Sequence, residues 1–166
     1  MSKAGPAPSG VSIRRLETDA EAEACARLMA SSEPWVTLGR TYDASLAIVR
    51  DPSREVHVAL DARGGVVGFL ILFLPGPFAG YLQTVCVAPE SRGQGLGRQL
   101  VEFAEQRIRE VSPNVFLCVS DFNPRARALY ERLGYQLVGE LADFLVRGHA
   151  ELLFRKTRGP WAEFGR

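Results

Sequence analysis

Apolar residues recur along the chain at two different spacings, and the spacing separates expected helices from expected strands. A recurrence every three or four residues predicts helices over 18–30, 42–49, 95–111 and 123–134. Continuous apolar runs between turn residues predict strands over 55–60, 66–74, 81–89, 114–119, 135–146 and 149–156, and the glycine-containing turn between the first two predicts a hairpin. The expected order is two helices, three strands, a helix, a strand, a helix and two strands, which indicates an α/β domain with helices on the faces of a mixed sheet.

Two of these helices have the clearest patterns. The first begins at Gly95, and its apolar face is expected to hold Leu96, Leu100, Phe103, Ala104, Ile108 and Val111. Polar side chains fill its opposite side, namely Arg98, Glu102, Glu105, Gln106 and Arg109. The second follows Asn123, with Pro124 suited to a first helical turn and Gly134 to a C-terminal stop. Its residues Ala126, Leu129, Tyr130 and Leu133 are expected to face inward.

Composition limits the chain to one globular domain without a marked charge. Of the 166 residues 46% are hydrophobic and 23% charged, and the net charge is +1. A chain of this size can form one hydrophobic core. A near-neutral net charge provides no overall electrostatic attraction to nucleic acid or membranes. We therefore expect a disordered lead-in over 1–10, a single domain over 11–156 and a tail over 157–166, with neither nucleic acid nor membrane as partner.

The cysteines and the N-terminal residues favour a cytoplasmic protein. Cys25, Cys86 and Cys118 stand far apart in apolar stretches, unlike the close pairs of a zinc site or the even count of a disulfide scaffold. The first ten residues have no hydrophobic run of the signal-peptide kind. The longest apolar stretch, 65–78, is too short for a membrane span and contains prolines, so it is interpreted as a buried strand.

The segment from Arg92 to Gly97 places three glycines at the mouth of a helix. Glycine costs about 1 kcal/mol of helix stability relative to alanine, so this placement needs a reason. Free backbone N–H groups at a helix start form an anion site, glycines let a ligand approach the main chain, and Arg92 adds a bidentate phosphate donor. The spacing fits neither the dinucleotide-binding turn nor the nucleoside-triphosphate loop, so the sequence predicts a different pyrophosphate site.

Two motifs in this order resemble a known family. The segment 85–101, VCVAPESRGQGLGRQLV, resembles the coenzyme A-binding segment of the GNAT superfamily of N-acetyltransferases, with matches at Arg92, Gly95 and Gly97. The segment 123–135 resembles the second motif of that family, with matches at Asn123, Ala126, Tyr130, Gly134 and Tyr135. The resemblance implies the GNAT fold: a mixed, mostly antiparallel sheet of about six or seven strands flanked by about four helices. It also implies acetyl-CoA as co-substrate and no metal.

The resemblance further implies the positions of the site residues. In that family the strand before the loop carries a bulge and diverges from the next strand, and acetyl-CoA lies in the resulting V. The implied coenzyme-binding residues are Val85, Cys86, Val87, Arg92, Gly93, Gln94, Gly95, Leu96, Gly97, Arg98, Asn123 and Tyr130. Backbone groups of Val85 and Val87 would pair with pantetheine, and an amide near Cys86 would polarise the thioester carbonyl. Tyr130 would be the catalytic acid that protonates the departing thiolate.

The general base is left open by the sequence. Many members of the family carry a glutamate on the strand before the loop, where this chain offers Tyr81 and Gln83. Deprotonation through a water molecule is one alternative. Glu33, His57 and His149 are others, although each residue type in these settings is more commonly a surface or packing residue.

The acceptor is left open as well. A small or amino-acid-like primary amine is the leading hypothesis. The segment SSEPW, 31–35, also resembles a segment of ribosomal-protein N-terminal-alanine acetyltransferases, which makes a peptide N-terminus the alternative. Against it, Cys118 replaces the expected base of that subfamily, and Phe144 and Leu145 replace its paired tyrosines. A non-catalytic acyl-CoA sensor, a partner-binding domain with a merely tight glycine turn, and a homodimer remain further hypotheses.

Overall fold

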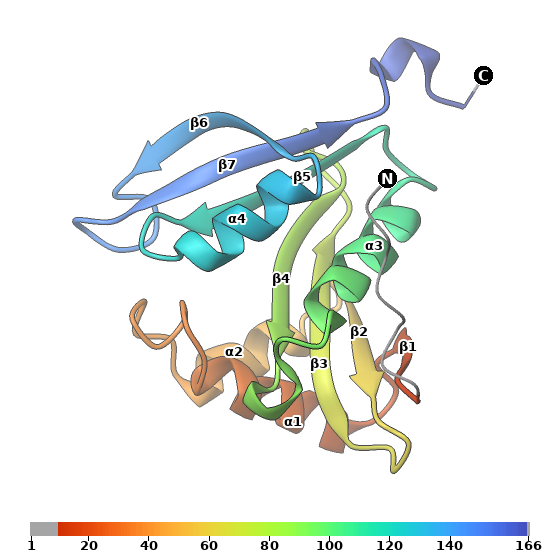
Figure 1. The fold of residues 1–166 in the computed structure, drawn as a ribbon, viewed down its shortest axis with the longest axis vertical. Coiled ribbons are helices and arrows are strands. Elements are labelled where there is room, and N and C mark those ends of the chain that lie inside the picture. The colour runs from red at the N-terminus through yellow and green to blue at the C-terminus, as the bar shows by residue number, and fades with distance from the viewer. Residues whose placement is uncertain (1–9, 166) are drawn as a thin grey trace.

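A computed structural model describes residues 10–165, so the expected lead-in lies almost wholly outside the described residues. These residues form one seven-stranded sheet in the order β1-β2-β3-β4-β5-β7-β6, with four α-helices (Figure 1). The elements are β1 (Ser12–Arg15), α1 (Asp19–Ala30), α2 (Tyr42–Val49), β2 (Glu55–Leu60), β3 (Val66–Phe73), β4 (Tyr81–Val87), α3 (Leu96–Ile108), β5 (Asn114–Ser120), α4 (Pro124–Arg132), β6 (Gln136–Ala142) and β7 (Ala150–Thr157). Neighbouring strands are antiparallel except β4 and β5, which confirms the expected mixed, mostly antiparallel sheet.

The sheet is covered on both faces. Helices α1 and α2 pack on one face against side chains of β2, β3 and β4, including Val58, Phe69 and Ile71. Helices α3 and α4 lie on the opposite face, where Leu100 and Phe154 are fully buried (Figure 1). Because the side chains of β3 alternate between the two clusters, that strand is the centre of the core. No helix within 10–165 has the length and apolarity needed to cross a bilayer.

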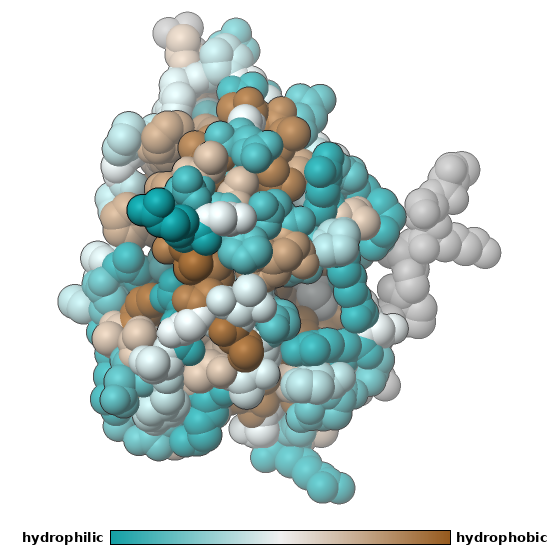
Figure 2. All heavy atoms as spheres, turned by 90° about the vertical axis from the view of Figure 1, so that its left-hand side faces the viewer, coloured by the Kyte–Doolittle hydropathy of each residue, from teal (hydrophilic) through white to brown (hydrophobic). Residues whose placement is uncertain are grey.

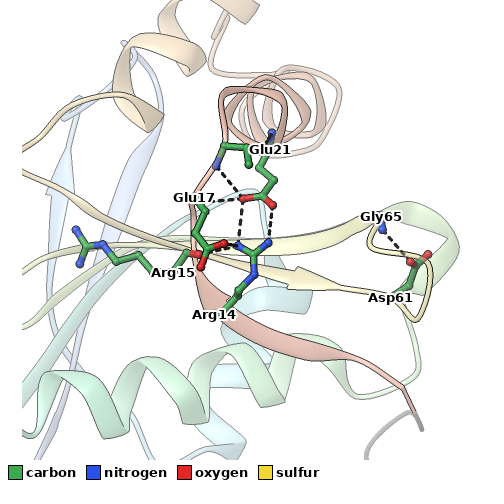
Figure 3. Close-up of polar contacts among 7 residues, drawn as sticks. Arg14, Arg15, Glu17, Glu21, Asp61 and Gly65 are labelled. Atoms are coloured by element: carbon green, nitrogen blue, oxygen red, sulfur yellow. Dashed lines mark hydrogen bonds and ion pairs between the residues drawn. The ribbon is translucent and has the colours of Figure 1, made fainter.

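The start of α1 is fixed by a capping box. The Thr18 side chain accepts the Glu21 N–H, and the Glu21 carboxylate accepts the Thr18 N–H in return. Glu21 also accepts two hydrogen bonds from Arg14 of β1, the shorter at 2.6 Å, and Figure 3 shows this carboxylate between the helix start and the Arg14 side chain. The hydrogen bond from Arg14 lowers the pKa of Glu21 to about 2. Strand β1 has little apolar periodicity, so the sequence did not predict it. The hydrogen bonds from Arg14 to Glu21 connect it to α1.

The hairpin expected between β2 and β3 is confirmed. The Asp61 carboxylate accepts the N–H groups of Arg63 and Gly65, the latter at 2.8 Å (Figure 3). Gly64 has a φ of +80°, and a Cβ added to it would meet no atom within 4 Å. The turn is therefore held by a local side chain and is open to solvent.

Besides the unpredicted strand β1, the expectations for α3, for Glu105 and for the end of β6 differ from the structure. Helix α3 ends at Ile108, so Val111 lies beyond it. Glu105 is buried rather than part of an outer polar side, because it binds Arg109 and Lys156 at 2.9 Å. Strand β6 ends at Ala142.

The early end of β6 has a local cause, which lies in the next residue. Asp143 takes a left-handed φ of +53°, and its carboxylate accepts the Gly148 N–H at 2.6 Å. The residues after β6 therefore form a loop. At the C-terminus β7 runs to Thr157, and Trp161 packs edge to face on Phe164 in the expected tail.

Strands β4 and β5 meet at one end and then diverge. Within the described residues their register has a single pair, Tyr81 with Phe116, and the Phe116 N–H donates to the Gly80 carbonyl at 3.0 Å. Gly80 has a φ of +93°, and a Cβ added there would lie 2.4 Å from the Asn114 carbonyl oxygen and 2.6 Å from a methyl of Ile108. Glycine is therefore required at the point where the two strands touch.

A bulge marks β4 shortly after that point. Ile71 of β3 pairs with Thr84, whereas the next residue, Leu72, pairs with Leu82, so Gln83 is the additional residue. A bulge bends its strand and increases the local twist. The bulged, diverging strand agrees with the arrangement that the family resemblance implies.

We predict that Gly80→Ala lowers the free energy of unfolding by about 2–4 kcal/mol, because it adds backbone strain to a steric overlap with β5 and α3. Gly64→Ala is the matched control, since it has the same sign of φ and open space, and it should lose only about 1 kcal/mol. Urea unfolding followed by circular dichroism measures both. Equal losses would show that the close approach at Gly80 is not a constraint.

Candidate active site

A cavity of about 620 Å³ opens where β4 and β5 diverge. Its walls come from β4, β5, α4 and β7, from residues 33–40 between α1 and α2, and from the loop between β6 and β7. Figure 2 shows this side of the molecule, with apolar surface in the middle of the face and polar surface around it. The cavity is thus a largely apolar pocket with a polar margin, which is typical of small-molecule sites.

The free edge of β4 faces this cavity. The Ala88 N–H donates to the Val67 carbonyl of the β3 side at 2.9 Å. Because backbone groups alternate along a strand, those of Val85 and Val87 point away from β3, as the predicted pantetheine contacts require. The N–H of Cys86 lies on the β3 side by the same alternation, so the free amide beside it belongs to Val85 or Val87.

The glycine-rich loop leads directly into α3. Gly93 and Gly95 have φ values of +75° and +83°, and Gly95 is the N-cap of the helix with no side-chain capping hydrogen bond. A Cβ on Gly97 would lie 3.8 Å from Val87 and 3.9 Å from Leu129 of α4. The N–H groups of Leu96, Gly97 and Arg98 therefore have no side-chain cap, and this helix start lies next to β4 and α4. Uncapped N–H groups at a helix start are suited to binding an anion.

Arg92 is held by the protein. Its Nε donates to the Val87 carbonyl at 3.0 Å, and its Nη2 donates to the Ser32 hydroxyl at 3.3 Å. These bonds use Nε and one hydrogen of Nη2, so the expected bidentate contact of Arg92 with phosphate would have to use Nη1 and the second hydrogen of Nη2. In this structure Arg92 instead braces the end of β4 against the turn after α1.

The other polar residues of the loop have local partners as well. The Gln94 amide donates to the Glu90 carbonyl at 3.3 Å, and Arg98 binds Glu102 at 2.7 Å on the exposed side of α3. An anion bound at this loop would therefore be held by backbone N–H groups more than by side-chain cations.

Asn123 and Tyr130 line the same cavity, as their seven-residue spacing predicts. Asn123 is the N-cap of α4, where its side-chain oxygen accepts the Ala126 N–H at 3.2 Å. Tyr130 is 8% exposed, and its ring packs edge to face on Tyr135. Burial raises the pKa of Tyr130, so its hydroxyl is protonated at neutral pH. This hydroxyl makes no hydrogen bond to any residue within 10–165 and is free to donate into the cavity.

A carboxylate absent from the sequence-based candidates also lines the cavity. Glu151 of β7 is 5% exposed, and the Ser120 hydroxyl of β5 donates to it at 2.6 Å. Burial raises the pKa of Glu151, and the neighbouring charge of Asp121 raises it further. The signal in the sequence was a single acid between the apolar residues Ala150 and Leu152 of a strand. A buried carboxylate in a cavity is a candidate for proton transfer.

The three earlier candidates for the base are less well placed. His57 is buried beside Glu55 and Phe103 and does not line the cavity. His149 contacts Asp121 at 3.3 Å, likewise outside the cavity. Glu33 lines the cavity, but it is exposed and accepts the Thr37 N–H at 3.2 Å.

The neighbouring thiols do not supply a base either. Burial raises the pKa of Cys118, which lines the cavity, and raises that of Cys86 to about 12. Both are therefore neutral thiols, and Cys86 packs in the core as expected. Among residues 10–165, no three His, Cys, Asp or Glu side chains gather as a metal ion would need.

Comparison with solved structures identifies the class of fold. An aminoglycoside 6'-N-acetyltransferase complexed with coenzyme A superposes with a TM-score of 0.74 at 20% identity, covering 90% of this chain and 98% of that chain. A GCN5-related N-acetyltransferase from Kribbella flavida superposes with a TM-score of 0.72 at 23% identity, covering 91% of this chain and 99% of that chain. The fold is therefore that of N-acetyltransferases.

Sequence comparison identifies the family. The model of the acetyltransferase (GNAT) family matches residues 13–135, and the chain belongs to this family. A mycothiol acetyltransferase of Beutenbergia cavernae is 35% identical over 57% of this chain and 32% of that protein. A peptidyl-lysine N-acetyltransferase of Escherichia coli is 30% identical over 53% of this chain and 54% of that protein. The matched part thus spans between a third and just over half of these curated relatives.

We predict that Gly95→Glu weakens coenzyme A binding by about tenfold or more, because it places a negative charge at the uncapped start of α3 and strains a left-handed position. Isothermal titration calorimetry measures the dissociation constant. Gly64→Glu makes the same change at an open left-handed glycine of the β2–β3 turn and should bind as the unchanged protein does. Unaltered binding by Gly95→Glu would remove the α3 start from the coenzyme site.

Proposed function

We propose that the protein is an acetyl-CoA-dependent N-acetyltransferase that acts on a primary amine. The observation that carries the proposal is one cavity that joins a protonated Tyr130, a buried Glu151 and the free edge of β4, next to the uncapped start of α3. In a direct transfer the amine nitrogen attacks the thioester carbonyl carbon and forms a tetrahedral intermediate. The intermediate then expels the coenzyme A thiolate and leaves an amide.

The backbone would hold the co-substrate. Free groups of Val85 and Val87 would pair with the pantetheine arm, and the N–H groups at the start of α3 would bind the pyrophosphate. An amide aimed at the developing oxyanion contributes roughly 3 kcal/mol in other acyl-transfer enzymes. The Val87 carbonyl already accepts from Arg92, which leaves the backbone groups of Val85 and the N–H of Val87 for the ligand. The donor that we assign to the thioester oxygen is one of these two N–H groups.

Two side chains would move the protons. At pH 7 the neutral form costs about 4.6 kcal/mol for a lysine-like amine and about 1 kcal/mol for an α-amino group. Glu151 would accept the proton that the amine loses. Its raised pKa makes the carboxylate a stronger base than an ordinary glutamate. Tyr130 would donate to the leaving thiolate. Reference pKa values for tyrosine and thiol differ by about 1.5 units, or roughly 2 kcal/mol. Burial raises the pKa of Tyr130 and widens this gap, so the hydrogen bond to the developing thiolate has to offset more than the reference difference.

The acceptor is proposed as a small or amino-acid-like amine. One relative, 33% identical over 52% of this chain and 53% of that protein, is an L-methionine sulfoximine/L-methionine sulfone acetyltransferase of Pseudomonas aeruginosa. The E. coli relative is named for peptidyl-lysine, so a peptide amine is the alternative. A panel of amino acids, simple amines and N-terminal peptides, assayed for acetyl-CoA-dependent thiol release, tests the proposal. Coenzyme binding without release for any acceptor would instead support an acyl-CoA sensor.

We predict that Tyr130→Phe lowers kcat by about 10²- to 10⁴-fold while leaving coenzyme A affinity within twofold, because it removes a proton donor and little contact area. Steady-state assays of thiol release measure kcat, and calorimetry measures binding. Tyr42→Phe removes a hydroxyl at the start of α2, outside the cavity, and serves as control. Full turnover by Tyr130→Phe would disprove the acid role.

We predict that Glu151→Gln removes an acidic limb from the pH profile of kcat/KM. Glu151 has a pKa above its ordinary value, and only its deprotonated form accepts a proton, so activity of the unchanged enzyme falls as the pH drops through that pKa. The variant should be slower by about 10²- to 10⁴-fold at neutral pH, and the deficit should shrink as rising pH delivers more neutral amine. Glu140→Gln on exposed β6 is the control. A profile unchanged in Glu151→Gln would leave deprotonation to water.

A further inference from the structure

Arg40 enters the cavity from the segment between α1 and α2. The Arg40 N–H donates to the Trp35 carbonyl at 2.9 Å, and the Leu38 N–H donates to the Pro34 carbonyl at 3.0 Å, so the segment is a compact turn. Figure 1 shows this segment rising from α1 and α2 toward the hairpin of β6 and β7. Trp35, Leu38 and Arg40 all line the cavity from this turn.

The Arg40 guanidinium has no partner within the part of the chain that the structure describes. Its Nε is buried without a hydrogen bond, and no carboxylate lies within ion-pair distance of the side chain. Burial lowers the pKa of Arg40, which shows that the charge is poorly solvated. A half-buried cation without a counter-ion is unfavourable for the free protein, so its place in a cavity indicates an anionic ligand.

A second arginine that lines the cavity, Arg54, does have a counter-ion. Arg54 forms an ion pair with Asp51, donates from Nε to the Gln83 side chain at 2.9 Å, and lies over the Phe73 ring at 5.4 Å. Its charge is paired with Asp51, and its Nε and Nη1 both have protein acceptors. Of these two cavity arginines, Arg40 is the one that lacks a counter-ion among residues 10–165 and whose Nε is buried without a hydrogen bond.

The other residues that line the cavity indicate which further groups a ligand with this anion would carry. Aromatic rings of Trp35, Phe73, Phe78 and Phe116 form much of the wall. The carboxylate of Glu151 lies on the β7 side, whereas Arg40 comes from the α1–α2 side. A ligand that fits these three features carries an amine, an anion and an apolar body.

We propose that Arg40 binds the carboxylate of the acceptor, and that the acceptor is an amino acid with an apolar or aromatic side chain. This inference rests on the proposed function, because it assigns a substrate class to the same cavity. The guanidinium fork matches a carboxylate through two parallel hydrogen bonds, which fixes the orientation of the acceptor. With the carboxylate on Arg40, the amine is free to lie toward Glu151 and Tyr130, and the apolar side chain lies against the aromatic wall.

Binding of an amine-free probe tests the inference without acetyl transfer. We expect 3-phenylpropanoate to bind about tenfold to hundredfold more tightly than its neutral match 3-phenylpropanamide, as measured by calorimetry. Arg40→Met should abolish this preference. Arg54→Met removes a charge of the same sign from the same cavity, but one already paired with Asp51, and should retain most of the preference. Equal binding of the two probes, or an unchanged preference in Arg40→Met, overturns the inference.

Two further measurements distinguish a failure of this inference from loss of the fold and from a failure of the proposed function. Arg40→Met should fold and raise Tm by about 2–4 °C, because it removes an unpaired buried charge, whereas loss of the fold would be visible in the same thermal melt. In acetyl transfer, phenylalanine should exceed phenethylamine in kcat/KM by about tenfold or more, and Arg40→Met should abolish that ratio. Equal rates overturn the carboxylate assignment and leave acetyl transfer standing. Absence of transfer to every amine, with the probe preference intact, overturns the proposed function and leaves Arg40 as a carboxylate-binding residue without an acceptor role.

Discussion

The contact between β4 and β5 at Gly80 is the constraint on which the rest of the structure depends. A glycine there lets the Asn114 carbonyl and Ile108 approach to distances that a side chain would forbid. The strands then pair at Tyr81 and Phe116 and separate, because Gln83 bulges from β4. A normal parallel ladder would use the backbone groups of Val85 and Val87 internally. The divergence leaves the Val85 groups and the Val87 N–H available and creates the cavity, while the Val87 carbonyl accepts from Arg92.

The proposed chemistry depends on this divergence because its groups come from both halves of the sheet. The β3–β4 half carries the free strand edge and the loop into α3, while Tyr130 and Glu151 belong to α4 and β7 beyond the gap. The Ser120 hydroxyl fixes the Glu151 carboxylate at 2.6 Å, and the N-cap hydrogen bond of Asn123 fixes the start of α4. Each side chain is thus oriented by its own half, and the contact at Gly80 sets the distance between the halves.

Features set by residues close together in the sequence could be predicted from it, whereas features set by contacts between distant residues could not. Helix caps and glycine turns are local, so α1, α4 and the β2–β3 hairpin were predicted with nearly the observed bounds. Strand β1 has little apolar periodicity and depends on the link from Arg14 to Glu21. Glu105 was assigned to a polar side because its partner Lys156 lies 51 residues away. Glu151 was overlooked for the same reason, since only the pairing of β5 with β7 places it beside Ser120.

The polar groups of the cavity differ in how far the protein satisfies them, and this difference separates structural from ligand-binding roles. Arg54 and Gln83 are bonded to each other, so they hold the walls in place. Tyr130 and Arg40 lack such partners within the described residues, although both are at least partly buried. Leaving a buried donor unpaired is unfavourable, and a ligand that carries a matching acceptor removes the penalty. The unpaired donors therefore match the two acceptor groups of our proposals: the leaving sulfur at Tyr130 and the carboxylate of the acceptor at Arg40.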